Sequence, residues 1–148
     1  MSKKIIPDIV SRFDIASVTG NAKVQDCARL MTDENIAALV VIDSNDKLIG
    51  IVTERDLTQR VLAPGVDSQN TIISEIMTAD PDTLSPDDSA IDAFELMQTK
   101  GYRHLPITED GKCISIVSIR DLYASVKDAL EQDIKETEAF VFSDRYAV

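Results

Sequence analysis

The chain has 148 residues, of which 44% are hydrophobic, and this is enough for one domain with a substantial core. Its formal net charge of −11 would repel a nucleic-acid backbone and argues against general binding to DNA or RNA. No run of about 18 apolar residues could span a membrane, and Cys27 and Cys113 lie in separate apolar runs, which favours buried thiols in the reducing cytoplasm.

The first half of the chain predicts alternating strands and helices. Val24, Cys27, Ala28 and Met31 have the spacing of one apolar helix face. A continuous apolar run over residues 37–42 indicates a buried strand. In chain order we expect strand 13–18, helix 21–34, strand 37–42, a hairpin turn at 43–46, strand 48–52 and helix 54–63.

The second half repeats this order after a polar linker at residues 64–71. Gly101 predicts the end of its first helix. In chain order we expect a helical turn at 73–77, strand 82–84, a helix beginning at 85–88, strand 103–108, a turn at 109–111, strand 113–117 and a helix from 119 past 130.

The two halves are an internal duplication. A shift of 65 residues aligns Arg55 and Asp56 with Arg120 and Asp121, each pair following an apolar run and a hydroxyl residue. Each β-α-β-β-α unit is too small to cover its own apolar sheet. The sequence therefore predicts a mixed α+β (α/β) fold of two units packed with pseudo-two-fold symmetry.

Three stretches carry a resemblance to a known family. They are Gly-Ile-Val-Thr-Glu-Arg-Asp at 50–56, Ser-Ile-Val-Ser-Ile-Arg-Asp at 115–121 and Gly-Tyr-Arg-His-Leu-Pro at 101–106. Together they resemble a tandem pair of cystathionine-β-synthase (CBS) domains, a Bateman module, over about residues 8–130. The resemblance implies a stand-alone pair with motif 1 at 8–63, a linker at 64–71, motif 2 at 72–130 and a tail at 131–148.

Such modules typically bind adenine nucleotides or related adenosyl ligands between the two motifs, and they usually pair as dimers. The resemblance thus implies a regulatory, energy-sensing homodimer with AMP, ADP or ATP as the probable ligand and NAD(H) or S-adenosylmethionine as further possibilities. No cofactor is required. A regulated partner protein is also implied, without its identity.

The residues at the two junctions suit such a ligand and also suit a simpler role. Asp56 can accept hydrogen bonds from a ribose hydroxyl pair, and Thr53 or Ser118 can bond ribose or phosphate. The alternative is a capping box, in which Thr53 with Asp56, and Ser118 with Asp121, satisfy the helix's own amides.

The resemblance assigns the two clefts unequal roles. Asp56 would face cations of the other motif, and the matching positions Ala37 and Ala38 leave the Asp121 cleft with fewer charges. We therefore expect a phosphorylated ligand in the Asp56 cleft, and a weaker, empty or less charged site at Asp121. In the Asp56 cleft, the resemblance implies ligand contacts from Thr53, Arg103, His104 and Arg120, with Thr83 near the adenine and with Pro106 and Ile51 as walls for the base. In the Asp121 cleft, it implies contacts from Ser118 and Arg55.

Simpler explanations exist for the cations as well. Arg103 has many acidic residues to pair with, and His104 at the start of a strand is compatible with ordinary packing. Ser115 stands where the first motif has Gly50, so we expect the second junction to differ in shape.

An enzyme is the least favoured class. One histidine and two separated cysteines offer no catalytic triad, and no zinc spacing or phosphate-binding loop is present. Residues 43–54 depart from a calcium-binding loop because Lys47 replaces a ligand and Leu48 replaces the required glycine. The competing hypothesis is a ligand-free dimerisation or protein-interaction scaffold.

The C-terminal tail carries large apolar residues on a charged helix. Leu130 and Ile134 share one face, and further apolar residues follow at Phe140-Val141-Phe142 and Tyr146. Such residues are rarely left in water. Three alternatives follow, namely packing on a second subunit, binding another protein, or covering the chain's own core.

Overall fold

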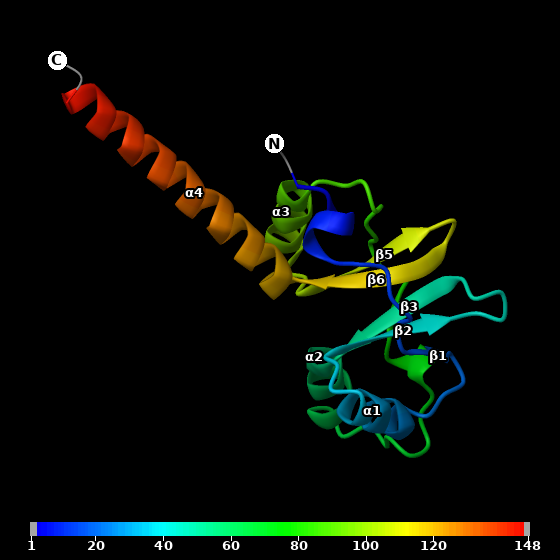
Figure 1. Ribbon diagram of the computed structural model, residues 1–148. Coiled ribbons are helices and arrows are strands. Elements are labelled where there is room, and N and C mark those ends of the chain that lie inside the picture. The colour runs from blue at the N-terminus through cyan, green and yellow to red at the C-terminus, as the bar shows by residue number, and fades with distance from the viewer. Residues whose placement is uncertain (1–2, 147–148) are drawn as a thin grey trace.

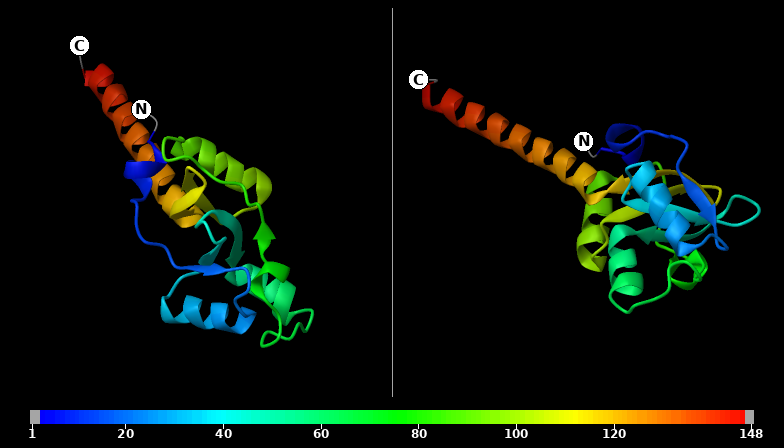
Figure 2. Two further views of the ribbon diagram at one scale, coloured as in Figure 1. Left: turned by 90° about the vertical axis from the view of Figure 1, so that its right-hand side faces the viewer. Right: turned by 90° about the horizontal axis from the view of Figure 1, so that it is seen from below.

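Two β-sheets, each flanked by helices, form the body of the molecule, and one long helix projects from it (Figure 1). The computed structural model describes the backbone of residues 3–146 and the side chains of residues 3–141. The views in Figure 2 separate the two halves and show the projecting helix leaving the second. The predicted mixed α+β class is confirmed.

The first half is a four-stranded sheet in the order β1-β2-β3-β4. Strands β1 and β2 are parallel, as their crossover helix α1 requires, and the remaining pairs are antiparallel. The elements are β1 (Ser17–Thr19), α1 (Val24–Asp33), β2 (Ala38–Ile42), β3 (Leu48–Thr53), α2 (Glu54–Leu57), the π-helical turn η2 (Thr58–Leu62), the 3₁₀ turn η3 (Ile73–Glu75) and β4 (Thr78–Ala79).

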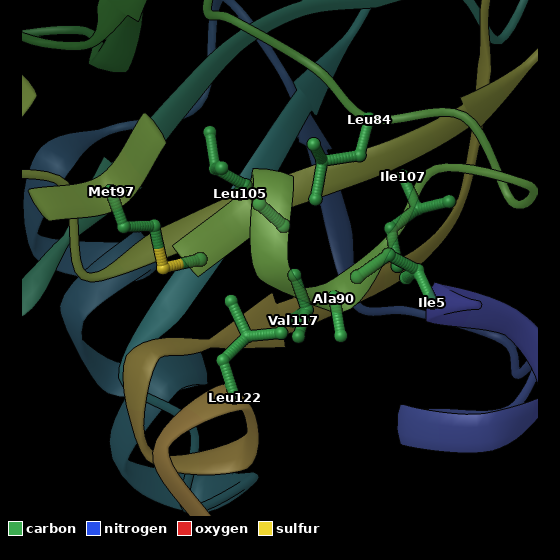
Figure 3. Packing of buried hydrophobic residues seen from close by; sticks show 9 residues of the cluster. Ile5, Leu84, Ala90, Met97, Leu105, Ile107, Val117 and Leu122 are labelled. Carbon is green, nitrogen blue, oxygen red and sulfur yellow. The ribbon is translucent and has the colours of Figure 1, made fainter. Parts of the chain in front are cut away.

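The second half is built on the antiparallel hairpin of β5 (His104–Glu109) and β6 (Lys112–Ser118). Its hairpin turns at Asp110 and Gly111, whose φ angles of 54° and 78° suit a tight two-residue turn. Helices α3 (Ala90–Lys100) and α4 (Ile119–Tyr146) complete it. Figure 3 shows its aliphatic core, in which Met97 of α3, Leu105 of β5 and Leu122 of α4 are fully buried or nearly so.

Each half receives a segment from the sequence of the other. The N-terminal π-helix η1 (Ile5–Ile9) lies on the second half, where Ile5 is fully buried and its N–H donates to the carbonyl of Asp88 at 2.9 Å. Conversely, β4 pairs with β3 of the first half, and Ile73 and Ile76 belong to the first core. The two packing units therefore do not coincide with the two sequence repeats.

Several predicted elements change at their ends. The strand expected at 13–18 is reduced to Ser17–Thr19, and the strand expected at 82–84 is a single bridge from Leu84 to Ile107. The helix expected from 85–88 begins at Ala90, because the side chain of Ser89 accepts the N–H of Asp92 at 3.1 Å and caps it. Gly101 ends that helix with φ 76°, as predicted.

The outer part of α4 contradicts one alternative for the tail. Leu130, Ile134, Phe140 and Val141 are 57%, 56%, 72% and 53% exposed, so they do not cover the chain's own core. The side chains of Phe142 and Tyr146 lie outside the described residues. Within residues 3–146, no helix has both the length and the apolar character needed to cross a membrane.

Candidate functional site

A cleft of about 280 Å³ is lined by residues of both halves. That volume is near the lower end of the roughly 300–1,000 Å³ typical of small-molecule sites. Strand β3 and the start of α2 contribute from the first half, and β5 with the loop before it contributes from the second. The lining residues are Ala37, Ile51, Thr53, Glu54, Arg55, Asp56, Gln59, Arg60, Thr78, Pro81, Asp82, Gly101, Tyr102, Arg103, His104, Leu105 and Pro106.

Asp56 is held by the capping box at the start of α2. The N–H of Thr53 donates to Oδ2 of Asp56 at 2.9 Å, and the N–H of Asp56 donates to Oγ1 of Thr53 at 3.2 Å. The capping alternative is thus confirmed here. It uses only one carboxylate oxygen, so Oδ1 keeps the capacity to accept further hydrogen bonds.

Arg60 connects this carboxylate to the neighbouring backbone. Its Nη2 lies 3.7 Å from Oδ1 of Asp56, and its Nη1 donates to the carbonyl of Ile76 at 2.9 Å. Asp56 is only 16% exposed, whereas Arg60 is 45% exposed. The guanidinium is therefore anchored on one side and open to the cleft on the other.

The second half supplies Tyr102, Arg103 and His104 directly after the left-handed Gly101 that ends α3. The backbone of Arg103 is tied to the root of α4, because the N–H of Ile119 donates to its carbonyl at 2.8 Å. The hydroxyl of Tyr102 donates to Oδ2 of Asp82 at 2.7 Å, and this hydrogen bond raises the pKa of Tyr102.

His104 is the chain's single histidine and is partly buried between the two junctions. Desolvation lowers its pKa below the usual value, although the carboxylates of Asp121 and Glu54 act in the opposite direction. The imidazole is therefore neutral at pH 7. Its Nδ1 is buried without a hydrogen-bond partner among the described residues. A buried polar atom of this kind costs free energy until a donor or acceptor reaches it.

The charge of the cleft differs from that of the whole chain. Three arginines, Arg55, Arg60 and Arg103, line it alongside three carboxylates, Glu54, Asp56 and Asp82. The chain as a whole has a net charge of −11. Because the formal charges of the lining cancel, an anion is repelled less in the cleft than over the acidic surface of the rest of the protein.

The structure brings together seven of the eleven predicted site residues. These are Ile51, Thr53, Arg55, Asp56, Arg103, His104 and Pro106. Arg55 lines this cleft, although the resemblance assigned it to the other one. Thr83, Ser118, Arg120 and Asp121 do not line this cleft.

Sequence reasoning missed six polar residues of the lining, namely Glu54, Gln59, Arg60, Thr78, Asp82 and Tyr102. Arg60 follows Asp56 by four residues, and that helical spacing is a signal that could have identified it. Asp82 and Tyr102 lie 20 residues apart, and nothing in the sequence pairs them before the chain is folded.

The second junction repeats the cap but has different surroundings. The N–H of Ser118 donates to Oδ2 of Asp121 at 2.9 Å, and the N–H of Asp121 donates to the hydroxyl of Ser118 at 3.2 Å. The buried Ser115 donates its hydroxyl to the carbonyl of Ser11 at 2.9 Å. At the matching position, Gly50 instead leaves room for the side chain of Met77.

Within the described part of the chain, no three histidine, cysteine or acidic side chains are grouped so that they could hold an ion. Burial also raises the pKa values of Cys27 and Cys113 to about 11, so both thiols are protonated near neutral pH.

Comparison with known proteins agrees with this architecture. The family model "CBS domain" matches the chain twice, at residues 6–63 and 73–128. A putative signal-transduction protein with CBS domains from Burkholderia ambifaria MC40-6 has a similar structure, with 41% identity and a TM-score of 0.71. The alignment covers 76% of this chain and 82% of that one.

Two further proteins extend the comparison. An uncharacterized 17.7 kDa protein of Acidianus ambivalens is 38% identical over 112 residues, which are 75% of this chain and 66% of that protein. The CBS domain pair of protein MJ0100, solved with 5′-methylthioadenosine and S-adenosyl-L-methionine, is 26% identical with a TM-score of 0.71. That alignment covers 82% of this chain and 98% of that one. Across eight of the curated relatives that it matches, the chain spans between 19% and 66% of their lengths.

Proposed function

Because the chain belongs to the CBS-domain family and carries two copies of the domain, we propose that it is a regulatory module that senses an adenine nucleotide or a related adenosyl compound. The ligand would occupy the cleft lined by Asp56 and Arg103. AMP, ADP and ATP are the first candidates, and NAD(H) and S-adenosylmethionine belong to the same chemical class.

The observation that carries this proposal is the meeting of Asp56 and Arg103, from different halves, in one cleft. The cap does not use Oδ1 of Asp56, so this oxygen can accept a hydrogen bond from a ribose hydroxyl. Arginine guanidinium groups suit phosphate oxygens. Ile51 and Pro106 offer an apolar wall for a base.

The comparison with protein MJ0100 supports the adenosyl part of the proposal. Its CBS pair was solved with two adenosyl compounds, neither of which carries a phosphate. The three arginines of the present cleft favour a phosphorylated member of that class. A second, weaker site would use Ser118 and Asp121, and Arg120 and Thr83 would approach the ligand from outside the described lining.

A second function is favoured by a separate observation. The exposed apolar residues of α4 suit a ligand-free scaffold that dimerises or docks on another protein. In either case we propose a non-catalytic, cytoplasmic protein, present as a homodimer, that regulates a partner. Energy sensing would follow if AMP and ATP compete for the cleft.

Thermal melting with AMP, ADP, ATP, NADH and S-adenosylmethionine tests the ligand proposal. A ligand at 100 times its dissociation constant adds about 2.7 kcal/mol to the free energy of unfolding. For a domain of this size, the midpoint then rises by on the order of 5–10 °C. If none of the five compounds raises the midpoint, the ligand proposal fails and the scaffold function remains.

Arg103→Ala and Arg29→Ala form a matched pair for this test. Both residues are exposed arginines, but only Arg103 lines the cleft. We expect Arg103→Ala to weaken nucleotide binding by roughly tenfold or more, because a charge-assisted contact is lost. Arg29→Ala is expected to bind as the unmodified chain does, and equal losses in both variants would count against the cleft.

A further inference from the structure

The outer part of α4 has no packing partner within the described chain. Leu122 is fully buried, but every residue from 127 to 141 is exposed. Figures 1 and 2 show this part of the helix leaving the body in every view. It is roughly 22 Å long at 1.5 Å per residue. An isolated helix of this length is marginal in water, so a surface that packs against it would stabilise it.

One face of this helix is apolar. Tyr123, Leu130, Ile134 and Val141 are 60%, 57%, 56% and 53% exposed. At about 100° per residue, they lie within roughly 40° of one another around the helix axis. Thr137 lies on the same face. We call the four apolar residues the α4 stripe. Its width suits a single partner helix.

Both borders of the α4 stripe are acidic. The helical spacing puts Asp133 on one side and Glu131 and Glu138 on the other. Two cations, Arg120 and Lys127, lie on the second side, and Nζ of Lys127 lies 4.0 Å from Oε1 of Glu131. Between residues 127 and 141 the three carboxylates beside the stripe therefore outnumber the single cation, Lys127.

This charge pattern disfavours a second copy of the same helix. In a parallel pair, Asp133 of one copy would lie near Glu138 of the other, and in an antiparallel pair Glu131 would lie near Glu138. Like charges in these positions are destabilising. A lipid surface is disfavoured as well, because helices that lie on membranes carry lysine and arginine beside their apolar face.

We propose that the α4 stripe binds an amphipathic helix of a partner protein whose apolar face is bordered by lysine and arginine. The apolar faces would supply the affinity, and the opposite charges on the borders would select the partner and its register. This surface lies outside the lining of the cleft, so its test needs no nucleotide.

Two synthetic peptide helices test the proposal with the full chain. Both carry leucine and isoleucine along one face, but one has lysines on its borders and the other has glutamates. Fluorescence anisotropy is expected to show the lysine peptide binding at least about ten times more tightly, with a difference that shrinks in high salt. Equal binding of the two peptides, or no binding of either, would overturn the proposal.

Variants locate the binding on the helix. Leu130→Gln combined with Ile134→Gln should weaken the lysine peptide by at least about tenfold. Glu138→Lys should weaken it by about fivefold, whereas Asp128→Lys, the same charge change on the back of the helix, should change it less than about twofold. All these positions are exposed, so melting curves should stay unchanged. Sedimentation equilibrium tests the competing occupant. If the chain self-associates and the Leu130/Ile134 variant does not, the stripe binds a second copy and the proposal is refuted.

Discussion

The carboxylate of Asp56 has one oxygen in the helix cap and one facing Arg60. The cap and the ligand contact are therefore compatible, because the cap orients the carboxylate and leaves Oδ1 for a hydroxyl donor. A short helix start of this kind can fix a binding group without any further scaffold.

Asp56→Ala and Asp121→Ala separate the two roles. Each variant loses the carboxylate half of its capping box, at a cost of about 1 kcal/mol in the free energy of unfolding. Only Asp56 lines the cleft, so Asp56→Ala should weaken nucleotide binding by roughly one to two decades. Calorimetric titration and chemical denaturation measure the two effects. If both variants bind nucleotide equally well, Asp56 is only a cap.

His104 predicts a pH dependence of stability. Because burial lowers its pKa in the folded chain, the unfolded chain binds more protons below about pH 6.5. Stability is thus complete above that pH and falls as the pH drops toward the lowered pKa. Melting between pH 7.5 and 5.5 should show this fall, and His104→Gln should flatten it. A single imidazole signal in an NMR titration checks the pKa directly, and a value above 6.5 would contradict the prediction.

Local spacing predicts contacts where residues lie close together in the sequence, whereas the meeting of Asp56 with Arg103 was predicted from the family resemblance. The Thr53–Asp56 pair follows from its spacing, and the cap is present as the spacing indicates. The contact between Tyr102 and Asp82 depends on how the loop before β5 packs, and no local pattern encodes it.

Strand β4 pairs with β3, and the side chain of Met77, directly before β4, packs against Gly50. Gly50 pairs with Ala79, and a Cβ added at Gly50 would meet Met77, including its Cγ at 3.0 Å and its Cε at 3.1 Å. The sequence repeat hides this requirement, because the aligned Ser115 faces a different segment. A glycine in the middle of a strand is therefore explained by a neighbour from the other repeat.

Gly50→Ala should lower the free energy of unfolding by about 1–3 kcal/mol, because the side chain of Met77 must move. Chemical denaturation measures the change. In the Met77→Ala background the same substitution should cost less than about 1 kcal/mol, since the obstructing atoms are gone. An equal cost in both backgrounds would mean that Met77 is not the obstacle.

The N-terminal segment is an integral part of the second half. Ile5 is fully buried there, beside Ala90 and Leu122. Ile5→Ala should therefore lower the free energy of unfolding by about 2–5 kcal/mol. Ile6→Ala is the matched control, because Ile6 is only partly buried and should cost less. Similar small losses in both variants would show that the segment is not part of the core.

The sequence predicts the strands and helices well and their partners poorly. The hydrophobic period and turn residues locate β2, β3, β5 and β6 because each depends on local pattern. The exchange of η1 and β4 between the halves depends on contacts between residues far apart in the chain. The duplication thus predicts two units, but the residues that complete each unit come from the other repeat.

At the scale of the whole molecule, the Asp56 cleft and the site proposed at Asp121 should behave differently. Arg103 and His104 line the Asp56 cleft, whereas the positions that match them in the other repeat are alanines. Calorimetric titration with AMP or ATP should therefore give one strong site per chain. Asp56→Ala should weaken that site by roughly one to two decades, while Asp121→Ala leaves it unchanged. Two equal sites would contradict this asymmetry.

The hydrogen bond from Ile119 to Arg103 joins a wall of the cleft to the root of α4. Helix α4 has 28 residues, which corresponds to a rigid arm of about 42 Å. A pivot of about 5° at Ile119 would swing its far end by roughly 4 Å. Sub-ångström adjustments around an occupied cleft would thus be amplified along this arm into a displacement that a distant protein can detect.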